Sequence, residues 1–248
     1  MSQVKRLRFL ASCVYASVLC VSMAAHGQDS TVTAQVDLRN ENSAQRQNNK
    51  ANVVIWLSAL EVTPGVRPAS DSGPVRHLRL VQKDKRFEPH VLVVPVGAGV
   101  EFPNRDPFFH NVFSLFEGKR FDLGLYEAGT SRLVHFDRPG VSYIFCNIHP
   151  EMSAVVIAVK TPYYAISDAM GKVAIERVPA GRYLMQVWAE GVSADNLKAL
   201  SREVTVSGTE PSLGAVRVVE DSPPAPHKNK YGRDYDAPGS DYPAPEPK

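Results

Sequence analysis

The residues best suited to chemistry stand in one short stretch, CNIHPEM, from Cys146 to Met152. It places a thiol at Cys146, an imidazole at His149 and a thioether at Met152, close enough for one metal ion to contact all three. A fourth ligand must come from elsewhere, and His110, 36 residues before Cys146, is the leading candidate. Two imidazoles and a thiolate in one plane, with a weaker axial thioether, make up the ligand set of a redox-active copper site.

These residue types suit copper better than other metals. Thiolate and thioether ligands favour Cu(I), and imidazole serves both oxidation states, so a rigid site lets the ion gain or lose one electron with little rearrangement. Structural zinc sites use closed sets of Cys and His instead, and Met is not among their usual ligands. The sequence therefore predicts a copper site with His110, Cys146, His149 and Met152 as ligands.

Each ligand taken alone has a simpler interpretation. Met152 would fill a gap in a core, His149 would be a loop residue, and Cys146 would be a small buried hydrophobic residue. The metal interpretation rests on their joint occurrence with His110 in an apolar segment. The remaining histidines outside the first 27 residues lack such neighbours and are interpreted as structural or solvated, with His90 a candidate for supporting the site: His77, His90, His135 and His227.

The first 27 residues have the features of a secretory signal peptide. Lys5, Arg6 and Arg8 precede an apolar run that ends in small residues, which predicts cleavage before Gln28. The LASC stretch ending at Cys13 resembles a lipidation box, but the apolar run follows it instead of preceding it. Cleavage would leave a periplasmic protein with no later segment long and apolar enough to span a membrane.

The mature chain has neither a nucleic-acid footprint nor a cysteine pair. Of 28 basic and 26 acidic residues, cleavage removes three basic ones, for a formal charge of −1. No strongly basic surface for nucleic acid is expected at that charge. Cys13 and Cys20 are removed as well, so Cys146 is left unpaired in an oxidising compartment where cysteines normally form disulfides.

Short segments rich in β-branched and alternating apolar residues follow one another through the chain, separated by Gly, Pro, Asn and Asp clusters. This pattern predicts an all-β protein built of sandwiches. Only the ADNLKAL segment, Ala194 to Leu200, suggests a short helix or a loop. After residue 219 the chain is rich in proline and charge, and such a composition buries too little apolar surface to offset its ordering entropy.

The region around the candidate ligands resembles a cupredoxin, a small blue copper protein. The resemblance rests on His110-Asn111, the segment from Gly140 to Tyr143 and the Cys-x-x-His-x-x-Met spacing, and the short loop with Pro150 after its histidine is most similar to amicyanin. It implies a Greek-key sandwich over residues 86–161 with one type 1 copper. It also implies that Asn111 braces the ligand loop by hydrogen bonding.

A second resemblance covers the segment that follows the copper-like region. YYAISDAMGKVAIERVPAGRYLMQVWAEG is similar to the carboxypeptidase regulatory-like, transthyretin-like sandwich. The order of parts resembles exported proteins labelled methylamine utilisation proteins. We therefore expect a signal peptide at 1–27 and an N-terminal β segment with a linker at 28–85, which is a candidate part of the second sandwich. The copper domain follows at 86–161, the second sandwich at 162–219 and a disordered Pro-rich tail at 220–248.

Two functions fit these features. The first is a single-electron carrier that docks a redox protein, a cytochrome or a periplasmic oxidoreductase, through an apolar patch of Phe108, Phe109, Ile148 and Pro150. In this hypothesis His149 is a candidate to detach and protonate when the copper is reduced at low pH. The second is a copper storage or delivery module.

Two further interpretations were weighed. One is a structural exported sandwich with an inert Cys146. The other is an enzyme, which we do not expect, because the sequence offers no second His-rich cluster, catalytic triad, phosphate loop or carboxylate pair.

Overall fold

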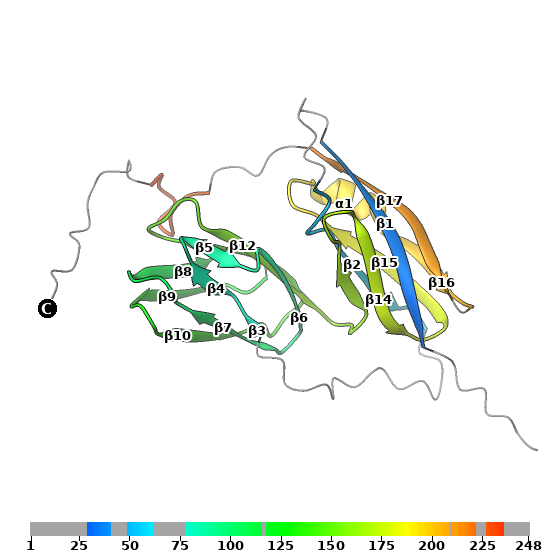
Figure 1. The fold of residues 1–248 in the computed structure, drawn as a ribbon, viewed down its shortest axis with the longest axis horizontal. Coiled ribbons are helices and arrows are strands. Elements are labelled where there is room, and N and C mark those ends of the chain that lie inside the picture. Colours follow the sequence, from blue (N-terminus) through cyan, green and yellow to red (C-terminus); the bar gives the residue numbers. More distant parts are fainter. Residues whose placement is uncertain are drawn as a thin grey trace, which may run out of the picture.

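In the residues that it describes, the computed structural model shows an all-β protein with one short helix, arranged as two β-sandwiches (Figure 1). It describes residues 29–40, 49–61, 78–115, 118–208, 210–221 and 227–235. The expected signal peptide and the stretch from residue 62 to 77 lie outside the described residues. Within the described ranges, no helix has the length and apolar character needed to cross a bilayer.

The first sandwich packs a five-stranded sheet against a three-stranded sheet. The larger sheet has the order β6 (Val91–Pro95), β12 (Ser153–Val159), β11 (Gly140–Cys146), β8 (His110–Ser114) and β9 (Phe121–Tyr126). All its pairings are antiparallel except that of β12 with β6. The smaller sheet has the order β10 (Ser131–His135), β7 (Gly99–Pro103) and β3 (Leu78–Arg79), beside a hairpin of β4 (Val81–Lys83) and β5 (Arg86–Glu88).

The alternating sequence pattern explains this packing. In β7 the side chains of Val100 and Phe102 are buried, whereas their neighbours along the strand are only partly so. Successive side chains of a strand point to opposite faces, so one face of the sheet closes the core. Cys146 and Met152 belong to this same core.

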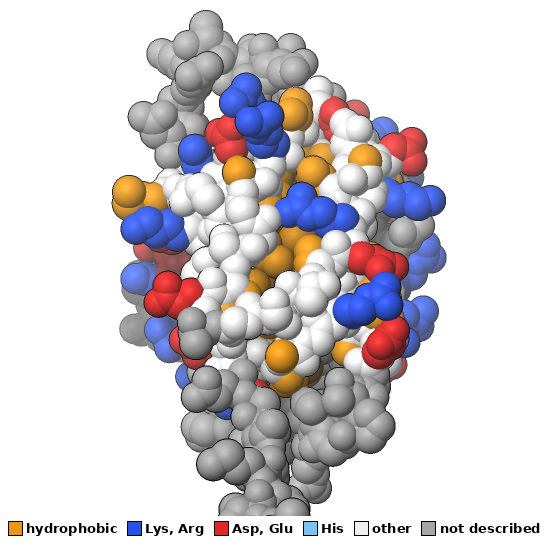
Figure 2. Space-filling view, turned by 90° about the vertical axis from the view of Figure 1, so that its right-hand side faces the viewer, with side chains coloured by type: hydrophobic (Ala, Val, Ile, Leu, Met, Phe, Trp, Pro, Cys, Tyr) orange, Lys and Arg blue, Asp and Glu red, His pale blue; other side chains and the backbone are white. Residues whose placement is uncertain are grey.

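The second sandwich is assembled from both ends of the chain. One sheet has the order β13 (Tyr164–Ile166), β2 (Val54–Ala59), β15 (Gly181–Trp188) and β16 (Arg202–Val206), and the other β14 (Lys172–Val178), β1 (Ser30–Asn40) and β17 (Ser212–Glu220). The helix α1 (Ala194–Leu200) lies between β15 and β16, where the sequence suggested a short helix or loop. Figure 2 views the molecule from the right-hand side of Figure 1, where the second sandwich lies. This face shows charges of both signs around a narrow apolar strip.

The first sandwich is therefore inserted into the second, between β2 and β13. The expected N-terminal β segment supplies β1 and β2 to the second sandwich, a question that the sequence left open. The first sandwich begins at β3, before the expected boundary at residue 86. That difference arises because β3 and β4 are too short for their pattern to stand out in the sequence.

A third hydrophobic cluster joins the two sandwiches. Strand β12 is buried on both faces: Val155 and Ile157 pack toward the second sandwich, whereas Ala154 and Val156 pack into the core of the first. Val54 and Trp188 meet it from the second sandwich. Trp188 is thus a buried residue between the two sandwiches.

Residues 227–235 differ from the expected disordered tail. They are described, and they contact the first sandwich next to Cys146 (Figure 1, orange-red). The average composition of the tail does not reveal the residues that make these contacts: His227, Lys230 and Tyr235.

Candidate metal centre

Two neighbouring strands and the loop between β11 and β12 bring the candidate ligands together. His110 is the first residue of β8 and Cys146 is the last residue of β11. These strands pair antiparallel with Cys146 opposite Val112, so residues 36 positions apart in sequence lie at one end of the sheet. His149 lies on the loop that follows β11, and its side chain comes close to both of these residues.

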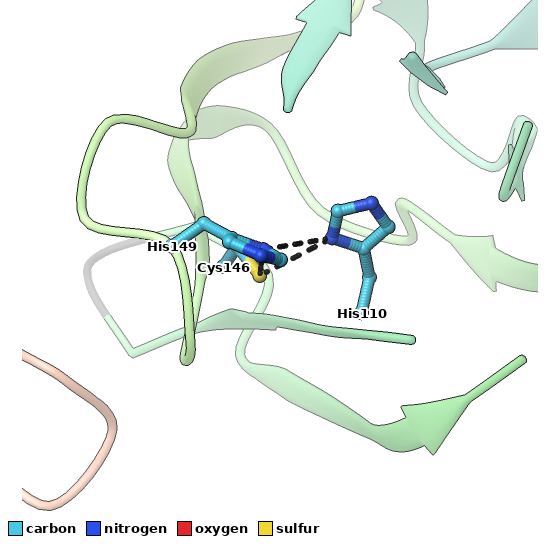
Figure 3. Close-up of side chains that lie close together, drawn as sticks. All are labelled: His110, Cys146 and His149. Atoms are coloured by element: carbon cyan, nitrogen blue, oxygen red, sulfur yellow. Dashed lines mark hydrogen bonds between the residues drawn. The ribbon is translucent and has the colours of Figure 1, made fainter. Parts of the chain in front are cut away.

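Three ligand atoms converge (Figure 3). The Sγ atom of Cys146 lies 3.6 Å from Nδ1 of His110 and 3.5 Å from Nδ1 of His149, and the two Nδ1 atoms are 3.1 Å apart. Cys146 and His110 are fully buried and His149 is half-buried. The cluster thus has one side toward the protein interior and one toward the surface.

These separations fit a shared metal ion. Metal–nitrogen and metal–sulfur bonds in protein sites are about 2.0–2.3 Å long. Ligand atoms at such distances from one ion, about 100–120° apart, would lie about 3.1–4.0 Å from one another. The observed range of 3.1–3.6 Å falls within this interval.

A buried carboxylate fixes the orientation of the His110 ring. The Nε2 atom of His110 lies 2.8 Å from Oδ2 of Asp106, and Asp106 is only 4% exposed. An ionised carboxylate can only accept a hydrogen bond, so the ring proton belongs on Nε2. The Nδ1 lone pair of neutral His110 is then free to face the cluster. Such carboxylate–histidine pairs commonly orient and strengthen metal ligands.

Asp106 is itself held by the turn between β4 and β5. Its carboxylate accepts hydrogen bonds from the backbone N–H groups of Asp84 at 2.6 Å and Lys85 at 3.1 Å. Burial alone would raise the pKa of Asp106, but these bonds and the one from His110 outweigh it, and the pKa is lowered. Asp106 is therefore an anion at neutral pH. The sequence analysis missed this residue, although its position four residues before His110, in PNRDP, was visible.

The environment keeps both imidazoles neutral. Burial lowers the pKa of His110, although Asp106 opposes the shift. Burial, then the neighbouring His110 and Lys85, lowers the pKa of His149 to about 4. The ring of Phe108 packs against both imidazoles, with centroid distances of 5.3 Å to His110 and 5.5 Å to His149. Neutral imidazoles are the form that binds a metal.

Opposing influences act on the pKa of the Cys146 thiol. Burial raises its pKa, whereas the backbone N–H groups of Ile148, Asn111 and His149 favour the thiolate by hydrogen bonding. The net effect without metal is a raised pKa. A metal cation would supply the charge that the buried thiolate lacks. In the described part of the chain, Cys146 is a free cysteine.

Met152 closes the ligand loop and is fully buried. The N–H of Cys146 donates to the Met152 carbonyl at 3.3 Å, and the N–H of Met152 donates to the His149 carbonyl at 3.1 Å. Met152 also belongs to the same core cluster as Cys146. Its service as an axial ligand stays a prediction.

Asn111 supports the loop with its main chain. Its carbonyl accepts a hydrogen bond of 2.8 Å from the N–H of Asn147, whereas its side-chain amide donates to Oδ1 of Asp122 at 2.7 Å. The resemblance implied a bracing hydrogen bond from Asn111 to the ligand loop. The structure gives the side chain a different partner on β9.

The ring of Phe108 packs against the half-buried His149, and Ile148 and Pro150 flank His149 in the sequence. Phe109 is 50% exposed and Pro150 is exposed, whereas Phe108 and Ile148 are partly buried. Their use by a partner stays a prediction. His90 lies outside the cluster: its Nε2 atom is 2.7 Å from Oε2 of Glu190 in the second sandwich, and its Nδ1 atom is 3.2 Å from the carbonyl of Ser153, the residue after Met152. Its support of the site stays a prediction.

Several solved structures resemble part of this chain. A purple cupredoxin from Nitrosopumilus maritimus matches at 23% identity, covering 33% of this chain and 99% of its own, with a TM-score of 0.30. A copper-containing nitrite reductase from Thermus scotoductus SA-01 matches at 25% identity, covering 40% of this chain and 25% of its own, with a TM-score of 0.33. A reduced amicyanin mutant matches at 20% identity, covering 42% of this chain and 99% of its own, with a TM-score of 0.32.

No protein-family model matches the chain, and no curated protein does. Because the structural overlaps are partial, the metal centre is inferred from the geometry of its own side chains. That geometry defines a half-buried cluster of one thiol and two neutral imidazoles, able to hold a transition-metal ion.

Proposed function

We propose that this protein is an exported, cupredoxin-like carrier of single electrons that holds one type 1 copper ion. The observation that supports this most is the approach of Cys146 Sγ and two histidine Nδ1 atoms to within 3.1–3.6 Å of one another. The signal-peptide features of the first 27 residues support export to the periplasm.

The chemistry of the donors favours copper. One thiolate and two imidazoles form the trigonal set of blue-copper sites, and a buried thioether nearby is suited to a weak axial contact. The bound copper would supply a one-electron redox couple. The protein contributes a fixed geometry: Asp106 orients His110, and backbone N–H groups surround the sulfur of Cys146. A site that is already ordered needs little rearrangement when its charge changes.

The surface near His149 suits a redox partner. His149 is the half-buried ligand, and the ring of partly buried Phe108 packs against it. Partly buried Ile148 and exposed Pro150 flank His149 in the sequence, and exposed Phe109 follows Phe108. Small apolar contacts of this kind serve transient encounters between electron-transfer proteins. With a mature formal charge of −1, docking would depend more on apolar contact than on long-range steering. A cytochrome or a periplasmic oxidoreductase is the expected class of partner.

The absorption spectrum of the Cu(II)-loaded mature protein tests the proposal. We expect an intense visible thiolate-to-copper band, absent from Cys146→Ser and strongly altered in His149→Gln. His135→Gln is the matched control, because His135 is an exposed histidine of the same sandwich outside the cluster. Its spectrum should equal that of the unmodified protein. Cyclic voltammetry should show a reversible one-electron wave.

Two other results would contradict the proposed role as an electron carrier. A colourless protein that retains copper through dialysis, without a reversible wave, would support storage or delivery instead. A protein that retains no copper would contradict both functions and leave Cys146 as a buried structural residue.

A further inference from the structure

The stretch 227–235 forms a compact turn of its own. The side-chain oxygen of Asn229 accepts hydrogen bonds from the N–H groups of Tyr231 and Arg233, both at 3.0 Å. The N–H of Asn229 donates to the Arg233 carbonyl at 2.9 Å, and the N–H of Gly232 donates to the carbonyl of Asn229. One asparagine thus organises the turn from within. We call residues 227–235 the C-terminal turn.

The C-terminal turn contacts the chain at the point where Cys146 leaves β11. The hydroxyl of Tyr235 donates a hydrogen bond of 2.7 Å to the Cys146 carbonyl. The N–H of Lys230 donates to Oδ1 of Asn147 at 2.9 Å. The ring of His227 stacks on Phe145, with centroids 4.0 Å apart and planes 23° apart. The turn therefore holds three consecutive residues centred on the thiolate ligand.

The hydrogen-bond directions follow from counting protons. The Cys146 carbonyl can only accept, so the single hydroxyl proton of Tyr235 points to it. The Nδ1 atom of His227 lies 3.1 Å from the same hydroxyl and must therefore donate to its oxygen. His227 thus donates to the oxygen of Tyr235, and Tyr235 donates to the carbonyl of Cys146.

A second connection reaches the other side of the loop. The Nζ atom of Lys230 lies 2.8 Å from Oδ2 of Asp122, and Oδ1 of Asp122 accepts from the side chain of Asn111. The carbonyl of Asn111 in turn accepts from the N–H of Asn147. Asn147 is therefore held on its main chain by β8 and on its side chain by the C-terminal turn.

We propose that the C-terminal turn is a clamp on the metal loop and that Tyr235 is a positioning residue for Cys146. The clamp slows loss of the metal and raises the reduction potential by directing a hydroxyl dipole at the Cys146 carbonyl. This inference rests on the proposed copper function for its metal readouts. Its effect on the loop itself does not depend on metal.

Tyr235→Phe tests the clamp in the full-length mature protein, because it removes one hydroxyl and keeps the ring. Tyr231→Phe is the matched control: it is the same change in the same turn, at a side chain that is 71% exposed. In the Cu(II)-loaded protein, excess EDTA should remove copper about fivefold faster from Tyr235→Phe, the size expected for one neutral hydrogen bond. The reduction potential should fall in Tyr235→Phe alone.

Hydrogen exchange of the metal-free protein gives an independent readout. The Asn147 amide, bonded to Asn111, and the Cys146 amide, bonded to Met152, should exchange about fivefold faster in Tyr235→Phe and be unchanged in Tyr231→Phe. Equal exchange in both variants would overturn the clamp. Faster exchange with unchanged metal loss and potential would overturn its action on the metal.

Failure of the proposed function gives a different result. If the unmodified protein retains no copper, the copper proposal fails, yet the exchange comparison still decides whether the turn holds the loop.

Discussion

The two sandwiches share an architecture but differ in what they bury. The core of the second sandwich is almost wholly hydrocarbon, and its buried polar residues, Ser30, Thr161 and Ser167, bond mainly to backbone groups. The first sandwich buries a longer polar set: Gln82, Asn104, Asp106, His110, Asn111, Ser114 and Ser142. A buried polar group is costly unless it is paired. The core of the second sandwich therefore contributes stability alone, whereas the core of the first also positions the candidate metal centre.

The largest expected effect comes from opening a cavity in the second core. Leu57→Ala removes most of a fully buried side chain, and we expect the free energy of unfolding to fall by about 2–5 kcal/mol. The spectrum of the copper-loaded protein should not change. Urea denaturation and absorption measure the two properties. Leu60→Ala, at a side chain that is 41% exposed, is the control and should cost far less. If folded Leu57→Ala lost the thiolate-to-copper band, the two cores would not be independent in this way.

The next effect comes from the buried carboxylate of the first core. Asp106→Asn removes the charge that fixes the Nε2 proton of His110, and we expect metal affinity to fall about 10–100-fold. Competition with a chelator measures this change. Asp137→Asn is the control, because Asp137 is an exposed carboxylate of the same sandwich, and it should leave affinity unchanged. Equal affinity in Asp106→Asn would remove Asp106 from the site.

A smaller effect concerns pH in the metal-free protein. The pKa of His149 is about 4 in the folded chain, below the usual histidine value of about 6.5, chiefly because of burial. Between these values the unfolded chain binds a proton at His149 and the folded chain does not, so the free energy of unfolding falls as the pH drops. His149→Gln should weaken this fall. Urea denaturation at several pH values tests it, and an identical slope in the variant would contradict the assignment.

The hypothesis that His149 detaches and protonates on reduction stays a prediction. It requires the reduction potential to change as the pH falls, and a potential that stays flat would contradict it.

The smallest effect lies between the sandwiches. Glu190 raises the pKa of His90 through a hydrogen bond of 2.7 Å, against the effect of burial. The raised pKa adds stability below about pH 6.5, and the gain disappears as the pH rises through the folded value. Because both side chains are about one third exposed, we expect no more than about 1 kcal/mol. Glu190→Gln should remove the difference in unfolding free energy between mildly acidic and alkaline pH.

The sequence predicted the all-β class and placed the candidate ligands on neighbouring elements. Local spacing sufficed for Cys146 and His149, because three residues of one tight loop must stay close. The approach of His110 followed from the resemblance and from its apolar segment. The hydrogen-bond partner of the His110 ring could not be predicted in this way. Asp106 is held in place by the turn at Asp84 and Lys85, about twenty residues earlier, and only the fold brings that turn to Asp106.

The C-terminal turn escaped prediction for a different reason. Composition averages over a segment, and the stretch beyond residue 219 is on average too polar and too rich in proline to fold alone. Residues 227–235 find order through another part of the protein, with Tyr235 and His227 as their anchors. A contact of that kind leaves no periodic signal.

The insertion of one sandwich into the other has a consequence for the order of folding. The inserted sandwich is complete once β12 has been made, and its paired residues lie at most 64 positions apart, between β6 and β12. Strand β1 must wait for β14 and β17, which follow it by more than 130 residues. Such distant pairings form slowly. The sandwich that carries the candidate metal centre can therefore fold as an early unit, and its finished surface at β6 and β12 can then serve as a template on which the two ends of the chain meet.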